Sequence, residues 1–126
     1  MSKSTNDKYT NEALRTESKL FQFTARTPRL MHIALGLTSE VGEIADQLKK
    51  HIFYGNELDE TNLKEEAGDV MWYLALLMDE LETTFNKEQN RNINKLKDRF
   101  PEKFTQDKVN NRDLDTERKG LEDDNN

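Results

Sequence analysis

Four carboxylates in two short, similar segments are the residues of this chain best placed to do chemistry. Residues 40–44 read Glu-Val-Gly-Glu-Ile, and residues 66–70 read Glu-Ala-Gly-Asp-Val. Crowded carboxylates repel one another unless protons or cations lie between them, and Mg²⁺ prefers oxygen ligands. The repeat therefore predicts a Mg²⁺ site whose ligands are Glu40, Glu43, Glu66 and Asp69.

The spacing within each segment supports this interpretation. Residues i and i+3 share one face of a helix, so the two carboxylates of each pair project together. In a chain that is 35% charged, one such pair alone is more often part of a solvated surface than part of a metal site. Two similar pairs with apolar flanks favour a metal site. A glycine inside a helix costs about 1 kcal/mol relative to alanine, so Gly42 and Gly68 suggest that backbone or ligand approaches closely.

The helices that carry the two pairs are predicted from hydrophobic periodicity. Apolar side chains recur at every third or fourth position over residues 29–52, and again from a cap at Asp59 or Thr61 to about Thr84. Gly55 ends the first of these helices or the loop after it. Because the connection is short, we expect an antiparallel hairpin that brings the two carboxylate pairs face to face.

The rest of the chain completes an all-α prediction. Residues 11–24 and 86–99 are two further expected helices, which gives an antiparallel bundle of about four helices. The sequence after residue 104 is polar. We therefore expect residues 1–104 to form the domain, and residues 105–126 to form an arm or a disordered tail.

The stretch 70–78 is apolar on every side of its helix. A helix with that pattern is buried all round, and one chain of 126 residues has too few helices to surround it. We therefore expect a homodimer or homotetramer to complete the bundle, with Trp72, Tyr73 or Leu76 in or near the interface.

Composition excludes several other classes of protein. The chain has 25 acidic and 19 basic residues, a net charge of −6, and no basic cluster typical of a nucleic-acid binder. It has no cysteine, which excludes disulfides, thiolate metal sites and a cysteine nucleophile. The run 70–78 is too short to cross a membrane, and the polar N-terminus is not a signal peptide. These features predict a cytoplasmic protein that binds neither nucleic acid nor membrane.

At the carboxylate segments, the sequence resembles the MazG-like nucleotide pyrophosphohydrolases, within the all-α triphosphate pyrophosphatase group. The family motif is Glu-Glu-x-x-Glu followed by Glu-x-x-Asp. Residues 39–43 read Ser-Glu-Val-Gly-Glu here, and residues 66–69 read Glu-Ala-Gly-Asp. Ser39 departs from the motif, but the four residues that resemble the metal ligands are present. The resemblance extends from about residue 21 to residue 104.

The resemblance implies Mg²⁺-dependent hydrolysis of a nucleoside triphosphate to the monophosphate and pyrophosphate, with Mn²⁺ as a substitute metal. It implies that the metals bind the phosphates and activate a water, for which Glu43 is the expected base. A basic helix end also resembles the family. It places Lys95 and Arg99 on one face, where they can bind the triphosphate, although an ordinary amphipathic face explains that pair equally well.

Two other classes of function remain open on the sequence. One is a helical assembly module that binds nucleotides or proteins without turnover. The other is a carboxylate metal-storage bundle, but the Glu-x-x-His pairs of di-iron bundles are missing, because neither His32 nor His51 lies three residues after a glutamate. Release of pyrophosphate from a panel of nucleotides distinguishes an enzyme from both.

Overall fold

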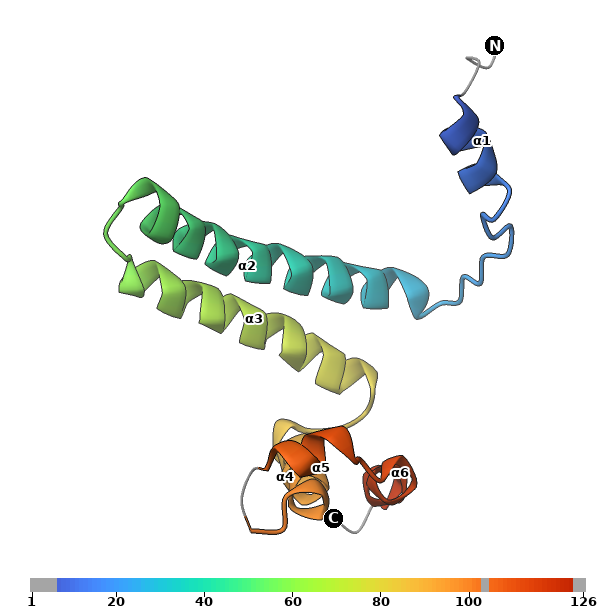
Figure 1. Ribbon diagram of the computed structural model, residues 1–126, viewed down its shortest axis with the longest axis vertical. Helices are drawn as coiled ribbons and strands as arrows, with labels where there is room; N and C mark the ends of the chain where they lie inside the picture. The colour runs from blue at the N-terminus through green and yellow to red at the C-terminus, as the bar shows by residue number, and fades with distance from the viewer. Residues whose placement is uncertain (1–6, 103–104, 124–126) are drawn as a thin grey trace.

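The computed structural model describes residues 7–102 and 105–123, and over these residues every regular element is a helix (Figure 1). This confirms the all-α prediction for the described part of the chain. The long helices α2 and α3 pack along each other, and α4 packs against α6 beyond the end of α3. The helices are α1 Lys8–Leu14, α2 Thr27–Tyr54, α3 Glu60–Glu80, α4 Phe85–Arg99, α5 Gln106–Asn110 and α6 Leu114–Glu122.

The two long helices begin and end at residues that suit those positions. Pro28 lies in the first turn of α2, where the missing N–H would have no helical partner anyway. Gly55 follows α2 at φ 72°, a left-handed value that favours glycine, and its N–H donates to the carbonyl of Lys50. Asp59 caps α3 by accepting a hydrogen bond of 3.0 Å from the backbone N–H of Asn62. The predicted hairpin is therefore confirmed, although α3 ends at Glu80 rather than near residue 84.

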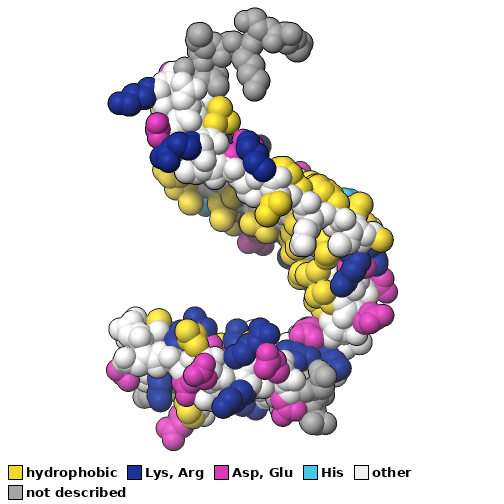
Figure 2. Space-filling view, turned by 90° about the vertical axis from the view of Figure 1, so that its right-hand side faces the viewer, with side chains coloured by type: hydrophobic (Ala, Val, Ile, Leu, Met, Phe, Trp, Pro, Cys, Tyr) yellow, Lys and Arg dark blue, Asp and Glu magenta, His cyan; other side chains and the backbone are white. Residues whose placement is uncertain are grey.

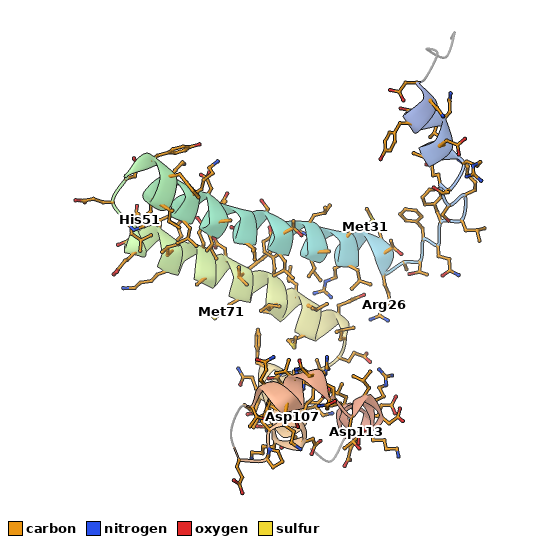
Figure 3. All side chains as sticks on the ribbon, viewed as in Figure 1. Arg26, Met31, His51, Met71, Asp107 and Asp113 are labelled. Atoms are coloured by element: carbon orange, nitrogen blue, oxygen red, sulfur yellow. The ribbon has the colours of Figure 1, made fainter. Side chains whose placement is uncertain are left out.

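Three contacts set the register of the α2–α3 hairpin. They are a hydrogen bond of 2.7 Å near the turn, a close packing contact in the middle and a salt bridge of 2.9 Å at the open end. The pairs are Gln47 with Asn62, Gly36 with Tyr73, and Arg26 with Glu80 (Figure 3 labels Arg26). Between the first two pairs, eleven residues back along α2 match eleven residues forward along α3. One turn from the first pair, this register places Glu43 opposite Glu66 and Glu40 opposite Asp69.

Gly36 is the glycine at which the two helices approach each other closely. A Cβ added there would meet ring atoms of Tyr73 at 2.1 to 2.6 Å. A Cβ at Gly42 or Gly68 would meet nothing within 4 Å in the described chain. The close approach of backbone suggested for those two glycines is therefore not found within one chain.

This contrast gives a stability prediction. We expect Gly36→Ala to lower the free energy of unfolding by about 1–3 kcal/mol, because the ring of Tyr73 must move out of the hairpin. Gly42→Ala should raise the free energy of unfolding by about 1 kcal/mol, because alanine favours helix and meets no neighbour. Urea denaturation in the presence of chelator measures both changes. Equal stability of the two variants would contradict the packing described here.

The first predicted helix is largely wrong. Only Lys8–Leu14 is helical, and residues 17–24 are not. Hydroxyl side chains bond the local backbone instead: Thr16 Oγ1 donates to the carbonyl of Ala13 at 2.9 Å, and Thr27 Oγ1 accepts from the N–H of Thr24 at 2.8 Å. Such bonds compete with helix, and a short helix with little packing against other described elements gains little from forming.

Over the residues that the structure describes, the segment after residue 104 contains the short helices α5 and α6. α6 is anchored to α4 by Glu117, which binds Arg99, and by the carbonyl of Leu121, which accepts a hydrogen bond from Arg91. Residues 103–104 lie outside the described residues, so a domain boundary at residue 104 stays a prediction.

Among the described residues of one chain, α2 and α3 pack chiefly against each other and the α4–α6 unit lies apart from most of the hairpin, so one chain does not form the predicted four-helix bundle (Figures 1 and 2). Ile33 is the one buried hydrophobic side chain among the described residues. The accessible surface is 10665 Å², whereas a compact monomer of 14.8 kDa would expose about 7,000 Å². Figure 2 shows hydrophobic side chains gathered on the hairpin. Exposed large hydrophobic residues of α2 and α3 include Leu35, Val41, Phe53, Met71 and Trp72.

None of the described helices combines the length and apolar character that a membrane span requires.

Candidate active site

Three of the four predicted carboxylates come together midway along the hairpin. One carboxylate oxygen from each of Glu40, Glu43 and Glu66 lies within 4.8 Å of the other two. Two of these residues share a face of α2, and the hairpin register brings the third across from α3. Glu66 is buried, Glu40 is half-buried and Glu43 is exposed. The cluster therefore has a closed side inside the hairpin and an open side toward solvent.

Asp69, the fourth predicted ligand, is exposed and stands outside that cluster of three among the described residues. It lies one turn after Glu66 on the same helix. Its negative charge contributes to raising the pKa of both Glu40 and Glu43. Asp69 is therefore exposed but within electrostatic reach of the cluster.

The pKa values of the cluster report the crowding of negative charge. A hydrogen bond with Glu66, then burial, then the nearby carboxylate charges raise the pKa of Glu40 to about 7. A hydrogen bond with Glu66 and the charge of Glu66 also raise the pKa of Glu43. The pKa of Glu66 is lowered, because its carboxylate accepts hydrogen bonds from Glu43 and Glu40. Below about pH 7, the metal-free cluster therefore retains a proton.

Two amide side chains that sequence analysis missed hold Glu66 in place. Nδ2 of Asn62 donates to Oε1 of Glu66 at 3.2 Å, and Nε2 of Gln47 donates to Oδ1 of Asn62 at 2.7 Å. Asn62 lies four residues before Glu66, and Gln47 lies four residues after Glu43. This i, i+4 spacing was the available signal, because it places each amide on the same helix face as a carboxylate.

The cluster fits an oxygen-binding divalent cation. When the carboxylates are ionised, Oε2 of Glu66 is buried and has no hydrogen-bond partner among the described residues. A buried charged oxygen without a partner is costly, so a proton or a cation is needed beside it. Mg²⁺ takes oxygen ligands and keeps several waters, which matches a carboxylate set that is open on one side.

The structure does not bring Lys95 and Arg99 to the carboxylates within one chain. Both residues lie on α4, which packs against α6 rather than along the hairpin. Arg99 is already paired: its Nε and Nη2 donate to the carboxylate of Glu117 at 2.8 and 2.9 Å. Glu117 also accepts a hydrogen bond from Arg112. These two guanidinium groups, Arg99 first, hold the pKa of the buried Glu117 well below its usual range.

These shifts predict how the stability of the metal-free protein depends on pH. Folding raises the pKa of Glu40 from its ordinary 4.5 to about 7. The contribution of Glu40 to the stability of the fold is therefore complete below pH 4.5 and is lost as the pH rises to about 7. Folding lowers the pKa of Glu117, so that contribution is present above pH 4.5 and is lost only as the pH falls.

In chelator, Tm should therefore decrease between pH 4.5 and 7, and it should decrease less in Glu40→Gln than in the wild type. Excess Mg²⁺ should restore the Tm of the wild type at pH 7 by binding the ionised cluster. Thermal melts at a series of pH values make the comparison. Identical dependence of Tm on pH for the two proteins in chelator would show that folding does not raise the pKa of Glu40.

Comparison with known proteins gives a family match over the hairpin and α4. The family model of the MazG nucleotide pyrophosphohydrolase domain matches residues 29–104. The chain is also 36% identical over 74 residues to the Gene 37 protein of Mycobacterium phage L5. That alignment covers 56% of this chain and 65% of the phage protein, which is under two thirds of the length of this relative. No solved structure matches. The family match includes the carboxylate cluster and α4, and it ends before α5 and α6.

Proposed function

Because this chain belongs to the MazG nucleotide pyrophosphohydrolase family, we propose that it hydrolyses nucleoside triphosphates between the α and β phosphates. The products are the nucleoside monophosphate and pyrophosphate. The observation that carries this proposal is the carboxylate cluster, in which a buried oxygen of Glu66 has no hydrogen-bond donor among the described residues once Glu40 and Glu43 are ionised. Such a site repels a triphosphate unless bound cations offset its charge, so a divalent metal is part of the proposal.

The ligands that we propose for Mg²⁺ are Glu40, Glu43, Glu66 and Asp69. When bound, the metal offsets the carboxylate charge, binds the phosphates and lowers the pKa of a water. Glu66 supplies a fixed, buried ligand oxygen. Asp69 and Glu43 are exposed, so substrate and water could reach them.

Glu43 is the proposed general base. It is the most accessible carboxylate of the cluster, so water can reach it. In the metal-free chain the neighbouring Glu66 raises the pKa of Glu43, and a raised pKa makes a carboxylate a stronger base. In the proposed step, a water oxygen forms a bond to phosphorus as its proton passes to Glu43. The α–β anhydride bond breaks, and its electron pair leaves with pyrophosphate.

Lys95 and Arg99 are proposed to bind the outer phosphates. A phosphate group presents paired oxygens to a guanidinium much as the carboxylate of Glu117 does. Arg99 would therefore exchange Glu117 for the substrate, and α4 would approach a carboxylate cluster, either its own or that of a second copy. Homodimer or homotetramer formation is part of this proposal, since it would cover the exposed hairpin.

A non-catalytic assembly module is the second candidate function. It is favoured by the exposed apolar side chains of the hairpin, which call for a partner regardless of chemistry. That candidate gives no role to the buried oxygen of Glu66, which needs a cation or a proton.

The deciding experiment measures release of pyrophosphate from a panel of ribo- and deoxyribonucleoside triphosphates in Mg²⁺, with Mn²⁺ as a second metal. We expect turnover of at least one nucleotide and none in excess chelator. Binding of nucleotides without any pyrophosphate release, in either metal, would favour the assembly module. Undiminished turnover in chelator would remove the metal from the proposal.

A further inference from the structure

We infer that Asn62 is a positioning residue for the metal site: it fixes Glu66 so that Oε2 is the oxygen left for a divalent cation, and Gln47 fixes Asn62 in turn. The inference rests on the proposed function. It adds two residues that lie outside the carboxylate pairs and come from both helices of the hairpin.

The chemistry of the three groups permits one arrangement. The carboxylate of Glu66 can only accept, so the amide nitrogen of Asn62 must face it. The amide oxygen of Asn62 then faces α2, where Nε2 of Gln47 supplies the donor. Each link has a defined direction, from Gln47 to Asn62 and from Asn62 to Glu66. Both hydrogen bonds are partly buried, so water replaces them poorly.

The hydrogen bonds from Gln47 to Asn62 and from Asn62 to Glu66 determine which oxygen of Glu66 is available to bind a metal ion. Oε1 accepts a hydrogen bond from the amide of Asn62, while Oε2 is buried and, once Glu40 and Glu43 are ionised, has no hydrogen-bond partner among the described residues. The last torsion of a glutamate side chain is soft and roughly two-fold, so a free carboxylate samples several orientations. The hydrogen bond from Asn62 removes that freedom before the metal arrives. Loss of an outer contact of this kind commonly weakens metal affinity about 10- to 100-fold.

A purely structural role predicts a different result. The hydrogen bond between Gln47 and Asn62 also joins α2 to α3 near the turn, so it contributes to the hairpin. If that were its whole role, removing it would lower stability in chelator and leave the affinity of the folded protein for metal unchanged. The two roles are therefore separated by measuring metal affinity and metal-free stability on the same variants.

The experiment uses the full chain with Mg²⁺ alone, measured by titration calorimetry, and with Mn²⁺ alone, measured by electron paramagnetic resonance. The variants are Asn62→Ala, Gln47→Ala and the double variant. Thr61→Ala is the control, because Thr61 is an exposed neighbour on the same turn of α3. Circular dichroism and melting in chelator establish that each variant folds.

We expect Asn62→Ala to weaken metal binding about 10- to 100-fold and Thr61→Ala to leave it unchanged. Gln47→Ala should have a smaller effect, and the double variant should match Asn62→Ala, because both residues act through one carboxylate. Wild-type affinity in Asn62→Ala, or additive losses in the double variant, would overturn the inference. If Asn62→Ala does not fold, Gln47→Ala alone decides, and unchanged affinity there overturns it. A wild type that binds neither metal would instead refute the proposed function.

Discussion

Replacement of Glu66 by glutamine should reduce nucleotide hydrolysis by at least about 10³-fold, or roughly 4 kcal/mol of transition-state stabilisation. Glu66 is the buried member of the cluster, and the pKa values of Glu40 and Glu43 both depend on it. Glutamine keeps the size of the side chain but removes the charge that a divalent cation needs. The same change relieves repulsion among ionised carboxylates, so the metal-free protein should be at least as stable as the wild type.

The matched control is Glu65→Gln, which changes an exposed glutamate at the preceding position. Steady-state kinetics with pyrophosphate detection, together with melts in chelator, measure both effects. Glu43→Ala and Asp69→Ala belong in the same series and should also lose activity. Wild-type turnover in Glu66→Gln would refute the metal site. A loss of activity that tracks a loss of folded protein would mean that Glu66 acts only on structure.

The isolated protein should be at least a dimer at micromolar concentration. One chain exposes 10665 Å² of surface, and its excess over a compact monomer, roughly 3,700 Å² per chain, is surface that association with another copy would bury. Light scattering should therefore report at least about twice the chain mass of 14.8 kDa. A mass of 14.8 kDa at that concentration would contradict the prediction.

A pair of matched substitutions tests whether the hairpin forms the interface. Leu35 on α2 and Leu114 on α6 are similarly exposed, at 66% and 62%. Leu35→Glu should weaken association by about 30-fold or more, because a central contact is typically worth 2 kcal/mol or more. Leu114→Glu should leave association unchanged. The fluorescence of Trp72, which is exposed in one chain, should shift on dissociation of Leu35→Glu. Equal behaviour of the two variants would place the interface elsewhere.

Local chemistry made the hairpin predictable from the sequence alone. The apolar period of 29–52, the turn at Gly55 and the cap at Asp59 act over a few residues, so they are visible without a fold. The i, i+3 spacing of each carboxylate pair is equally local. The same local reasoning was wrong for residues 11–24, because a helix of marginal propensity forms only where its apolar face meets a partner.

The tertiary structure decided which side chains meet. The register of α2 on α3 makes Glu66 the buried carboxylate, leaves Asp69 exposed, and brings Asn62 and Gln47 to the site. The packing of α6 against α4 pairs Arg99 with Glu117, which lies 18 residues later in the sequence. Burial and hydrogen bonding of these groups depend on contacts between segments, and a sequence pattern records only what one segment prefers by itself. The four carboxylates could therefore be singled out from the sequence as candidate metal ligands, whereas their different environments required the folded chain.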